Sequence, residues 1–562
     1  MADLFPHYPS PPDELIGIAA QLLRASGDTS STVGDVESGM GRAVDAVDGD
    51  ISFPMAQAPD PAVRNGTSVA EAAQFASGAV MFFAQAVQTY NDGIDRLNAQ
   101  VREGEFDVMS LGRAEKLRRL QAEQARLDEA LDAAAARVAG MLDRGPNPDD
   151  AGFLEDHGYL LSPDGGDVRS IVATMPAGND PDAMRRWWDS LTLAQQVAIV
   201  AARPDLLGNT DGLPAETRDE ANRLVMADDY ERLKANEVAG TLTDTEAQAL
   251  ANIEKARQNL EAREGHIDPI TGAPVHAQLY IYEPYAFDGD GRIAIATGNL
   301  DEANHLAVLV PGMGARAESM GSGRSLNVYD ESRWASGDSV AVLDWVGYDA
   351  PSGSFDGGIT GVVNQQMARD GASYLAADVE GLRAARGDDP AHLTVIGNSY
   401  GSTTAGIAAA EYDLDADDLI LTGSPGVPVG DAGDLTTAHD HTWVGSASRD
   451  FVSSLGRTGW TDPTEVFNPF PGQVELLGND PSEDTFDANR FQAESINRGD
   501  DWNIDDHNHY YDKNTESLYN VAAITTGHYE DVTRADPRYD PWYASLRDPE
   551  RGRTPHEMHH AP

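Results

Sequence analysis

The sequence of 562 residues contains no cysteine. This absence excludes disulfide bonds, catalytic thiols and zinc sites with cysteine ligands. It gives no information about the cellular compartment. Proteins without cysteine occur on both sides of a membrane.

Basic residues are scarce, with 40 Lys and Arg against 93 Asp and Glu, and the formal net charge is −53. A field of this sign repels nucleic acids and anionic membrane surfaces. We therefore exclude nucleic-acid binding as the function. The charge predicts a solubilising surface, and a cationic partner is the alternative.

Long apolar runs are also missing. No stretch approaches the roughly 18 apolar residues of a membrane span, so we predict no transmembrane segment. Residues 1–15 are acidic and rich in proline, and they lack the basic and apolar regions of a signal peptide. We expect a protein that is cytoplasmic or exported by a route without a conventional signal peptide. The sequence does not indicate the oligomeric state.

The length predicts about two to four domains. Apolar residues recur at three- and four-residue spacings over 69–101 and 111–142, which predicts two long helices. Glycine and proline at 145–148 end the second helix. The predicted segments are a helical hairpin domain (1–145), a helical linker or cap (146–265), an α/β catalytic domain (266–546) and a disordered tail (547–562).

After residue 265, short apolar runs alternate with helical segments. This order is typical of a mostly parallel sheet with helices on both faces. A β-hairpin is expected first, with its turn at 288–291. The predicted strands are 277–282, 292–297, 306–310, 340–343, 393–396, 419–421 and 442–444.

Residues 397–401 read Gly-Asn-Ser-Tyr-Gly and match G-x-S-x-G, with Ser399 at the centre. A predicted strand precedes them and an Ala-rich helix follows. In a strand–turn–helix of this kind, the serine hydroxyl is exposed on a strained turn. The next amide, that of Tyr400, then faces the developing oxyanion. The context predicts Ser399 as a catalytic nucleophile, and a purely structural loop is the alternative.

A serine hydroxyl needs a histidine base and a carboxylate that orients the base. In enzymes with such a turn, the acid follows the serine along the chain and the histidine follows the acid. Asp450 comes after the predicted strand 442–444, so we predict it as the acid. His507 and His509 follow it, and either can be the base. His439 and His441 also follow the serine, but they precede Asp450, which is the wrong order.

The second oxyanion donor is expected in the loop after an early strand. The predicted strand 306–310 runs into Pro-Gly-Met-Gly at 311–314, and the amides of Met313 and Gly314 are the candidates. No G-x-x-x-x-G-K-[ST] motif is present, which argues against a phosphate-binding loop.

Two short motifs suggest a metal but lack the context for one. His556 and His560 frame an H-E-x-x-H motif. It lies next to the C-terminus, where a helix would fray and fail to hold two imidazoles. Residues 288–291 (Asp-Gly-Asp-Gly) lack the later ligands of a calcium loop and suit a hairpin turn. We predict neither a metal nor a cofactor.

Several motifs together resemble an actinobacterial α/β-hydrolase family of unknown function. The resemblance covers roughly residues 180–530 and implies an α/β-hydrolase fold with a mostly parallel sheet, preceded by an all-α N-terminal region. It also implies hydrolysis of carboxylic esters, with His507 as the base and His509 in reserve. Asn398 departs from the histidine often found there, which bears on substrate preference. The motifs are Val-Pro-Gly at 310–312, Trp-Val-Gly-Tyr-Asp-Ala-Pro at 345–351, Gly-Asn-Ser-Tyr-Gly-Ser at 397–402, Gly-Ser-Pro-Gly at 423–426, His507-x-x-Tyr510, and a lead-in segment at 207–214 with Arg218 and Asn222.

The predicted function is that of a serine hydrolase, esterase- or lipase-like, which acts on a small-molecule or lipid ester through an acyl-enzyme. The alternative is a non-catalytic secreted or interaction protein whose helical N-terminal half binds a partner.

Overall fold

The computed structural model describes most of the chain, and the chain divides into two compact units. The helical unit comprises Met1–Ala177 and Arg186–Leu207, and the sheet unit comprises Gly178–Arg185 and Gly208–Pro562. The described residues are 5–9, 12–45, 60–102, 113–161, 168–351, 365–437, 440–447, 450, 452–454, 477–493, 505–535 and 558–559.

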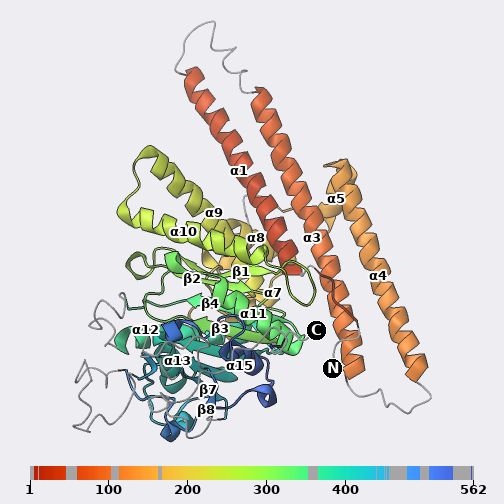
Figure 1. Ribbon diagram of the computed structural model, residues 1–562. Coiled ribbons are helices and arrows are strands. Elements are labelled where there is room, and N and C mark those ends of the chain that lie inside the picture. Colours follow the sequence, from red (N-terminus) through yellow and green to blue (C-terminus); the bar gives the residue numbers. More distant parts are fainter. Residues whose placement is uncertain are drawn as a thin grey trace. The chain divides into compact units, whose positions relative to one another are not determined.

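Three long helices dominate the helical unit (Figure 1). The two helices predicted from spacing are present as α3 and α4. Helix α1 was not predicted, because residues 26–35 are mostly Gly, Ser, Thr and Asp, which are weak helix formers. The bounds are α1 (Pro12–Asp45), α3 (Asp60–Arg102), α4 (Arg113–Arg144), α5 (Pro148–Asp156), α6 (Val168–Val172) and α8 (Leu193–Ala202); α7 (Pro181–Ser190) is divided between the units.

Tertiary packing supports α1 against α3. The Ser26 hydroxyl donates to the Ala70 carbonyl at 2.7 Å, and the Ser77 hydroxyl donates to the Ala19 carbonyl at 2.7 Å. The later residue of α1, Ser26, meets the earlier residue of α3, and the earlier residue of α1 meets the later one, Ser77. The two helices are therefore antiparallel. Buried packing outweighs weak helix propensity in this part of α1.

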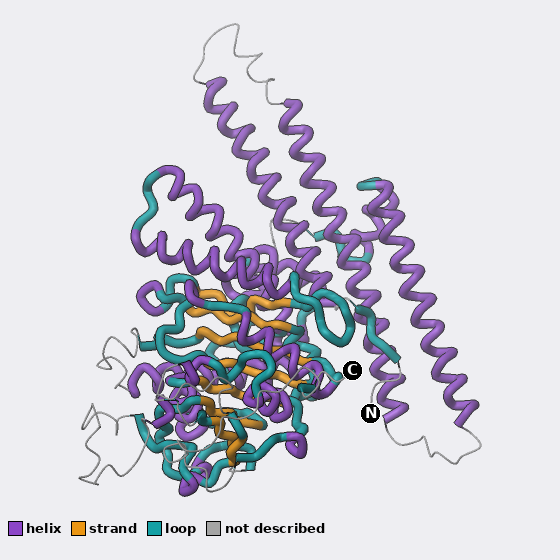
Figure 2. The backbone as a smooth tube through the Cα atoms, in the orientation of Figure 1, coloured by secondary structure: helices purple, strands orange, loops and turns teal. Residues whose placement is uncertain are grey.

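The sheet unit is built on one eight-stranded sheet in the order β1-β2-β4-β3-β5-β6-β7-β8 (Figures 1 and 2). The first two strands form the predicted hairpin, and β2 pairs antiparallel with β4; all later neighbours are parallel. The strands are β1 (Ala277–Glu283), β2 (Arg292–Thr297), β3 (His305–Val310), β4 (Val340–Val346), β5 (His392–Asn398), β6 (Asp418–Thr422), β7 (Thr442–Gly445) and β8 (Asn489–Phe491).

The predicted strands and the mostly parallel sheet are therefore confirmed. The analysis missed β8, whose three residues are too few for an apolar pattern. The helices of this unit are α9 (Ala215–Ala239), α10 (Asp244–Glu264), α11 (Gly323–Ser336), α12 (Gln365–Arg386), α13 (Tyr400–Glu411), α14 (Asp505–Asn508) and α15 (Glu516–Thr525).

Both faces of the sheet are buried, which explains why its strands read as continuous apolar runs. Alternate residues of a strand point to opposite faces. In β3, Val308 belongs to the core shared with α12 and α13, whereas Leu309 belongs to the core shared with α11 and α15. The four helices thus hold the central strands, and the loops at the strand ends, in place.

The lead-in segment protects the edge strand β1. The Asn209 side chain accepts from the Tyr282 amide at 2.9 Å and donates to the Tyr282 carbonyl at 3.0 Å, as a neighbouring strand would. The buried Arg218 guanidinium lies over the Tyr280 ring, 3.7 Å from its centre, and donates to the Tyr280 carbonyl. An uncovered edge invites pairing with other chains. We therefore infer that Asn209 and Arg218 have a structural role, which is to cover the edge of β1.

Two residues of the expected disordered tail are described, and they are ordered. Met558 is buried, and the His559 ring stacks on Tyr519 with centres 3.7 Å apart. The His559 amide donates to a Glu331 carboxylate oxygen at 2.8 Å. The rest of residues 536–562 lies outside the described residues. In the described parts of the chain, no helix has both the length and the apolarity that a membrane crossing requires.

Candidate active site

The predicted site residues come together at the carboxyl edge of the parallel strands. Ser399 follows β5, and Asp450 lies a few residues beyond β7. His507 lies on α14, after β8. Loops at this edge form the binding site in open α/β sheets. Ser399 and the Asp450–His507 pair therefore lie at the same edge, because the strands that precede them belong to one sheet.

Ser399 occupies a strained turn. Its φ of 56° and ψ of −129° lie where residues with a side chain rarely occur. The surroundings hold it there, because its amide donates to the Thr422 carbonyl at 2.9 Å and its carbonyl accepts from the Ser402 amide at 2.9 Å. Ser399 is only 4% exposed and caps the start of α13.

Glycines make the turn sterically possible. A Cβ on Gly401 would lie 2.3 Å from the Val310 carbonyl oxygen, and one on Gly397 would lie 2.6 Å from the Ser402 Cα. Both distances are far below van der Waals contact. The two glycines of G-x-S-x-G are thus required by close backbone approach.

A third glycine brings the loop after β3 against the serine. A Cβ on Gly312 would lie 2.7 Å from the Ser399 Cβ and 3.1 Å from its Oγ. The sequence analysis quoted Gly312 only as part of a motif. Its signal was the glycine directly after a strand and a proline, which allows this close approach.

Asp450 is 1% exposed and its carboxylate is fully hydrogen bonded. His507 Nδ1 lies 2.8 Å from Oδ2, and the Tyr510 hydroxyl donates to the same oxygen at 2.8 Å. The amides of Val452 and Ser453 donate to Oδ1 at 2.8 and 3.4 Å. Because a carboxylate only accepts, Nδ1 carries the proton of a neutral His507, which leaves a lone pair on Nε2.

Tyr510 was quoted in the sequence analysis without a role. Its hydroxyl also accepts from the Ala447 amide at 3.0 Å, which fixes the phenol between the loop after β7 and Asp450. Gly423, after β6, was likewise named only as part of a motif, with no role in the site. A Cβ there would lie 2.8 Å from Asp450 Oδ2 and 2.9 Å from His507 Nδ1. Its φ of +54° also favours glycine.

The other downstream histidines lie elsewhere. His509 is exposed, and its Nδ1 pairs with Asp512 rather than Asp450. His441 Nδ1 lies 3.0 Å from Asp418, at the amino end of the strands. His439 lies outside the described residues. Of the two candidate bases, the structure places only His507 beside Asp450.

The two candidate oxyanion amides of the loop after β3 differ. The Gly314 amide already donates to the Pro351 carbonyl at 3.0 Å. The prediction of Gly314 as a donor is therefore wrong, because a single N–H is engaged within the fold. Met313, one residue earlier, stays a candidate. The Tyr400 amide stands in the first turn of α13, where backbone N–H groups lack helical partners.

Comparisons with known proteins agree with this architecture. A family model described as "Alpha/beta hydrolase" matches residues 288–459, which include Ser399 and Asp450 but not His507. The fold is that of an α/β hydrolase.

Relatives share a longer part of the chain. An "Uncharacterized protein" of Mycobacterium tuberculosis is 33% identical over 393 residues, which are 65% of this chain and 59% of that protein. An "Uncharacterized protein" of Mycobacterium bovis is 28% identical over 200 residues, which are 33% of this chain and 71% of that protein. The chain thus spans 59% of the length of the first relative.

In this α/β-hydrolase fold, the Trp-Val-Gly-Tyr motif after β4 contacts both the turn of Ser399 and the loop after β3. The rings of Trp345, Tyr348 and Tyr400 stack in series, with centres 5.9 and 6.4 Å apart. The Tyr348 hydroxyl donates to the Pro311 carbonyl at 2.8 Å, which holds the loop that carries Met313. Burial raises the pKa of Tyr400 to about 12, so its phenol stays neutral.

Of the two metal-like motifs, only the one at 288–291 lies wholly within the described residues. Among the described residues, no group of three or more His, Asp or Glu side chains could hold a metal ion. Residues 288–291 connect β1 and β2 of the predicted hairpin. His559 belongs to the H-E-x-x-H region and packs on Tyr519; His556, Glu557 and His560 lie outside the described residues.

Proposed function

We propose that this α/β hydrolase is a serine hydrolase that cleaves carboxylic esters through an acyl-enzyme. One observation is the main support for the proposal. The buried Asp450–His507 pair stands at the same sheet edge as Ser399, whose turn is strained as a nucleophile's is. A small-molecule or lipid ester is the substrate in this proposal.

The proposed reaction has two halves. In the first, the Ser399 hydroxyl attacks the ester carbonyl, while His507 Nε2 takes its proton and then gives it to the leaving alcohol. Asp450 holds the imidazole and stabilises its positive charge. In the second half, water attacks the carbonyl of the acyl-enzyme and His507 takes a proton from that water. His507 then donates this proton to Ser399 Oγ as the carboxylic acid leaves.

The amides of Tyr400 and Met313 are the proposed donors to the oxyanion. Backbone donors that are already in place need no reorganisation during the reaction, and each supplies about two to three orders of magnitude in rate. Every step uses groups of this chain, and the proposal requires no cofactor.

A fluorophosphonate probe tests the proposal. We expect the folded wild-type chain to form one covalent adduct, which mass spectrometry of the digested protein places on Ser399. The Ser399→Ala variant is expected to take up no label, as is heat-denatured wild type. A folded wild type that resists the probe contradicts the proposal and favours the non-catalytic alternative, in which the helical unit binds a partner.

Gly423→Ala is expected to lower kcat/KM for a short nitrophenyl ester at least about 100-fold. The added Cβ would push apart Asp450 Oδ2 and His507 Nδ1, which lie under 3 Å from it. Gly527→Ala is a matched control, since Gly527 also has a positive φ (+72°) but no atom within 4 Å of a new Cβ. It should cost about 1 kcal/mol of stability and leave kcat/KM within about twofold. Similar kinetic losses in both variants would show that backbone strain, not crowding of the pair, is responsible.

A further inference from the structure

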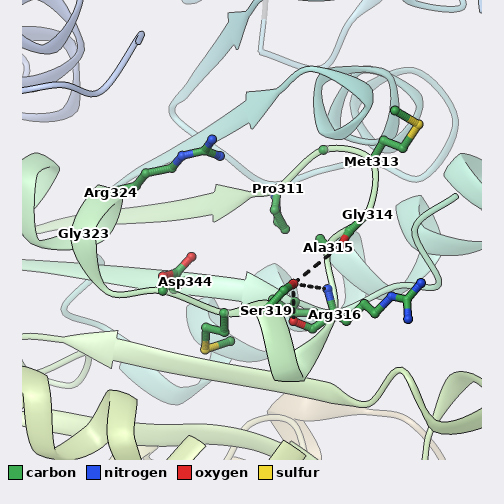
Figure 3. A pocket seen from close by; sticks show the side chains of 13 residues that line it. Pro311, Met313, Gly314, Ala315, Arg316, Ser319, Gly323, Arg324 and Asp344 are labelled. Atoms are coloured by element: carbon green, nitrogen blue, oxygen red, sulfur yellow. Dashed lines mark hydrogen bonds between the residues drawn. The ribbon is translucent and has the colours of Figure 1, made fainter. Parts of the chain in front are cut away.

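A pocket of about 430 Å³ lies beside the nucleophile in the sheet unit (Figure 3). Two of its lining residues contact the turn of Ser399. Gly312 approaches Ser399 itself, as described above. Arg324 Nη1 donates to the Asn398 side-chain oxygen at 3.3 Å. A molecule whose ester group reaches Ser399 can therefore extend into this pocket.

Three charged side chains line the pocket, and two of them are neutralised by neighbours. The Asp344 carboxylate accepts from the fully buried Arg263 at 2.9 Å. Burial raises the pKa of Asp344, and the Arg263 charge opposes that shift. Arg316 lies 3.6 Å from an Asp290 oxygen and 3.7 Å from a Glu318 oxygen. These groups contribute little net charge to the pocket.

Arg324 is the third, and it forms no ion pair with a described residue. Its charge also acts on the Asp344 carboxylate, but that carboxylate is already bonded to Arg263, so the group of two arginines and one carboxylate keeps a net positive charge. The hydrogen-bond partner of Arg324 is the neutral amide of Asn398, and no carboxylate in the described part of the chain lies within 4.0 Å of Arg324. In Figure 3, Arg324 and Arg316 stand at separate sides of the pocket. Arg324 is exposed, so its guanidinium is accessible to a ligand that enters the pocket.

We propose that Arg324 binds an anionic group of the substrate, a carboxylate or a phosphate, so that the ester cleaved at Ser399 carries a negative charge. The inference rests on the proposed function and specifies its substrate class. A guanidinium has several N–H donors in one plane and matches the paired oxygens of either group. The bond to Asn398 uses one of these donors and leaves others for the ligand.

The rest of the lining suits a short apolar chain between the ester and the anion. Met313, Met320 and Val346 contribute apolar surface, and Gly321 and Gly323 add no side chain. The Asn398 position, where the resembled family often has histidine, orients Arg324 here. This contact explains how the residue before the nucleophile can set substrate preference without taking part in the reaction.

Two pairs of nitrophenyl esters, each with one anionic and one neutral member, test the inference on the full chain. In the acyl pair, 4-nitrophenyl hydrogen succinate carries a carboxylate where 4-nitrophenyl 4-methylpentanoate carries an isopropyl group. In the leaving-group pair, 3-carboxy-4-nitrophenyl acetate is compared with 4-nitrophenyl acetate. All rates are corrected for spontaneous hydrolysis. Inhibition by inorganic phosphate at constant ionic strength tests the phosphate alternative.

We expect the wild type to prefer the anionic ester of one pair at least about tenfold in kcat/KM, or to be inhibited by phosphate at millimolar concentration. Arg324→Gln should lower that ratio, or raise the inhibition constant, by about 10- to 100-fold. Arg324→Lys, which keeps the charge, should retain part of the preference. Arg316→Gln removes the arginine whose charge is balanced by Asp290 and Glu318. It should change the ratio of kcat/KM between the anionic and the neutral ester by less than about threefold.

The outcomes separate this inference from the proposed function. A wild type that reacts with the fluorophosphonate, shows ratios near one in both pairs and is not inhibited by phosphate overturns the anion site alone. A preference that survives Arg324→Gln also overturns it. Equal losses on both esters of a pair assign Arg324 a structural role and overturn it as well. A wild type that resists the fluorophosphonate contradicts the proposed function itself.

Discussion

His507→Ala is expected to lower kcat/KM for 4-nitrophenyl butyrate by about four orders of magnitude, whereas His509→Ala should lower it less than about threefold. The two histidines are two positions apart, but only the His507 ring meets the buried Asp450 carboxylate, at 2.8 Å. His509 is exposed and pairs with Asp512. The His507→Ala variant lacks the proposed base for the Ser399 hydroxyl. Steady-state kinetics on the purified full chain measures both effects.

His509→Ala is itself the matched control for this experiment, because it removes the same side chain from the same loop. Circular dichroism and thermal melting of both variants show whether either has lost its fold. If His509→Ala is the inactive variant, the assignment of the base is reversed. Equal and small effects would show that neither histidine serves Ser399.

Asp450→Asn is expected to lower kcat/KM by about 10⁴-fold with the fold intact. The Oδ2 atom accepts from both His507 and Tyr510, and an amide at this site presents either an N–H₂ group to those donors or an oxygen without charge. Either orientation disturbs the His507 tautomer in which Nδ1 carries the proton and Nε2 carries a lone pair. The variant also loses the charge that stabilises the imidazolium.

Asp418→Asn is a close control for Asp450→Asn. Asp418 is buried and binds His392 at 2.9 Å and the Tyr529 hydroxyl at 2.7 Å, but it lies at the amino end of the sheet. Both variants remove a buried charge bonded to a histidine and a tyrosine, so both should lower the melting temperature. Only Asp450→Asn should remove the activity. Losses of activity of similar size would indicate that the effect of Asp450→Asn is one of stability.

Local context was sufficient to predict much of the fold and part of the candidate site. A strand buried on both faces must be apolar along its whole length, so the central strands could be found one at a time. The turn at Ser399 could be found because glycine, serine and glycine lie within five residues, between a strand and a helix. The Asp450 position followed from its place after another strand.

The remaining features depend on contacts between distant segments. Nothing in residues 505–511 shows which histidine will face Asp450, and nothing at Gly314 shows that the Pro351 carbonyl will accept its amide hydrogen. The crowding around Gly423 involves Asp450, 27 residues later, and His507, still further along the chain. The same holds for Arg324, which meets Asn398 across the sheet edge.

The amino-acid sequence by itself therefore determined the alternating α/β architecture, the strand–turn–helix that holds Ser399 and the order of the proposed serine, acid and base. Each of these depends on a short stretch of chain and its backbone chemistry. Only the tertiary structure decided that His507 rather than His509 meets Asp450, that the Gly314 amide is engaged within the fold, and that Arg324 stands beside Asn398 without an ion pair to a described residue. These depend on which strand ends become neighbours, and packing of the whole sheet sets that arrangement.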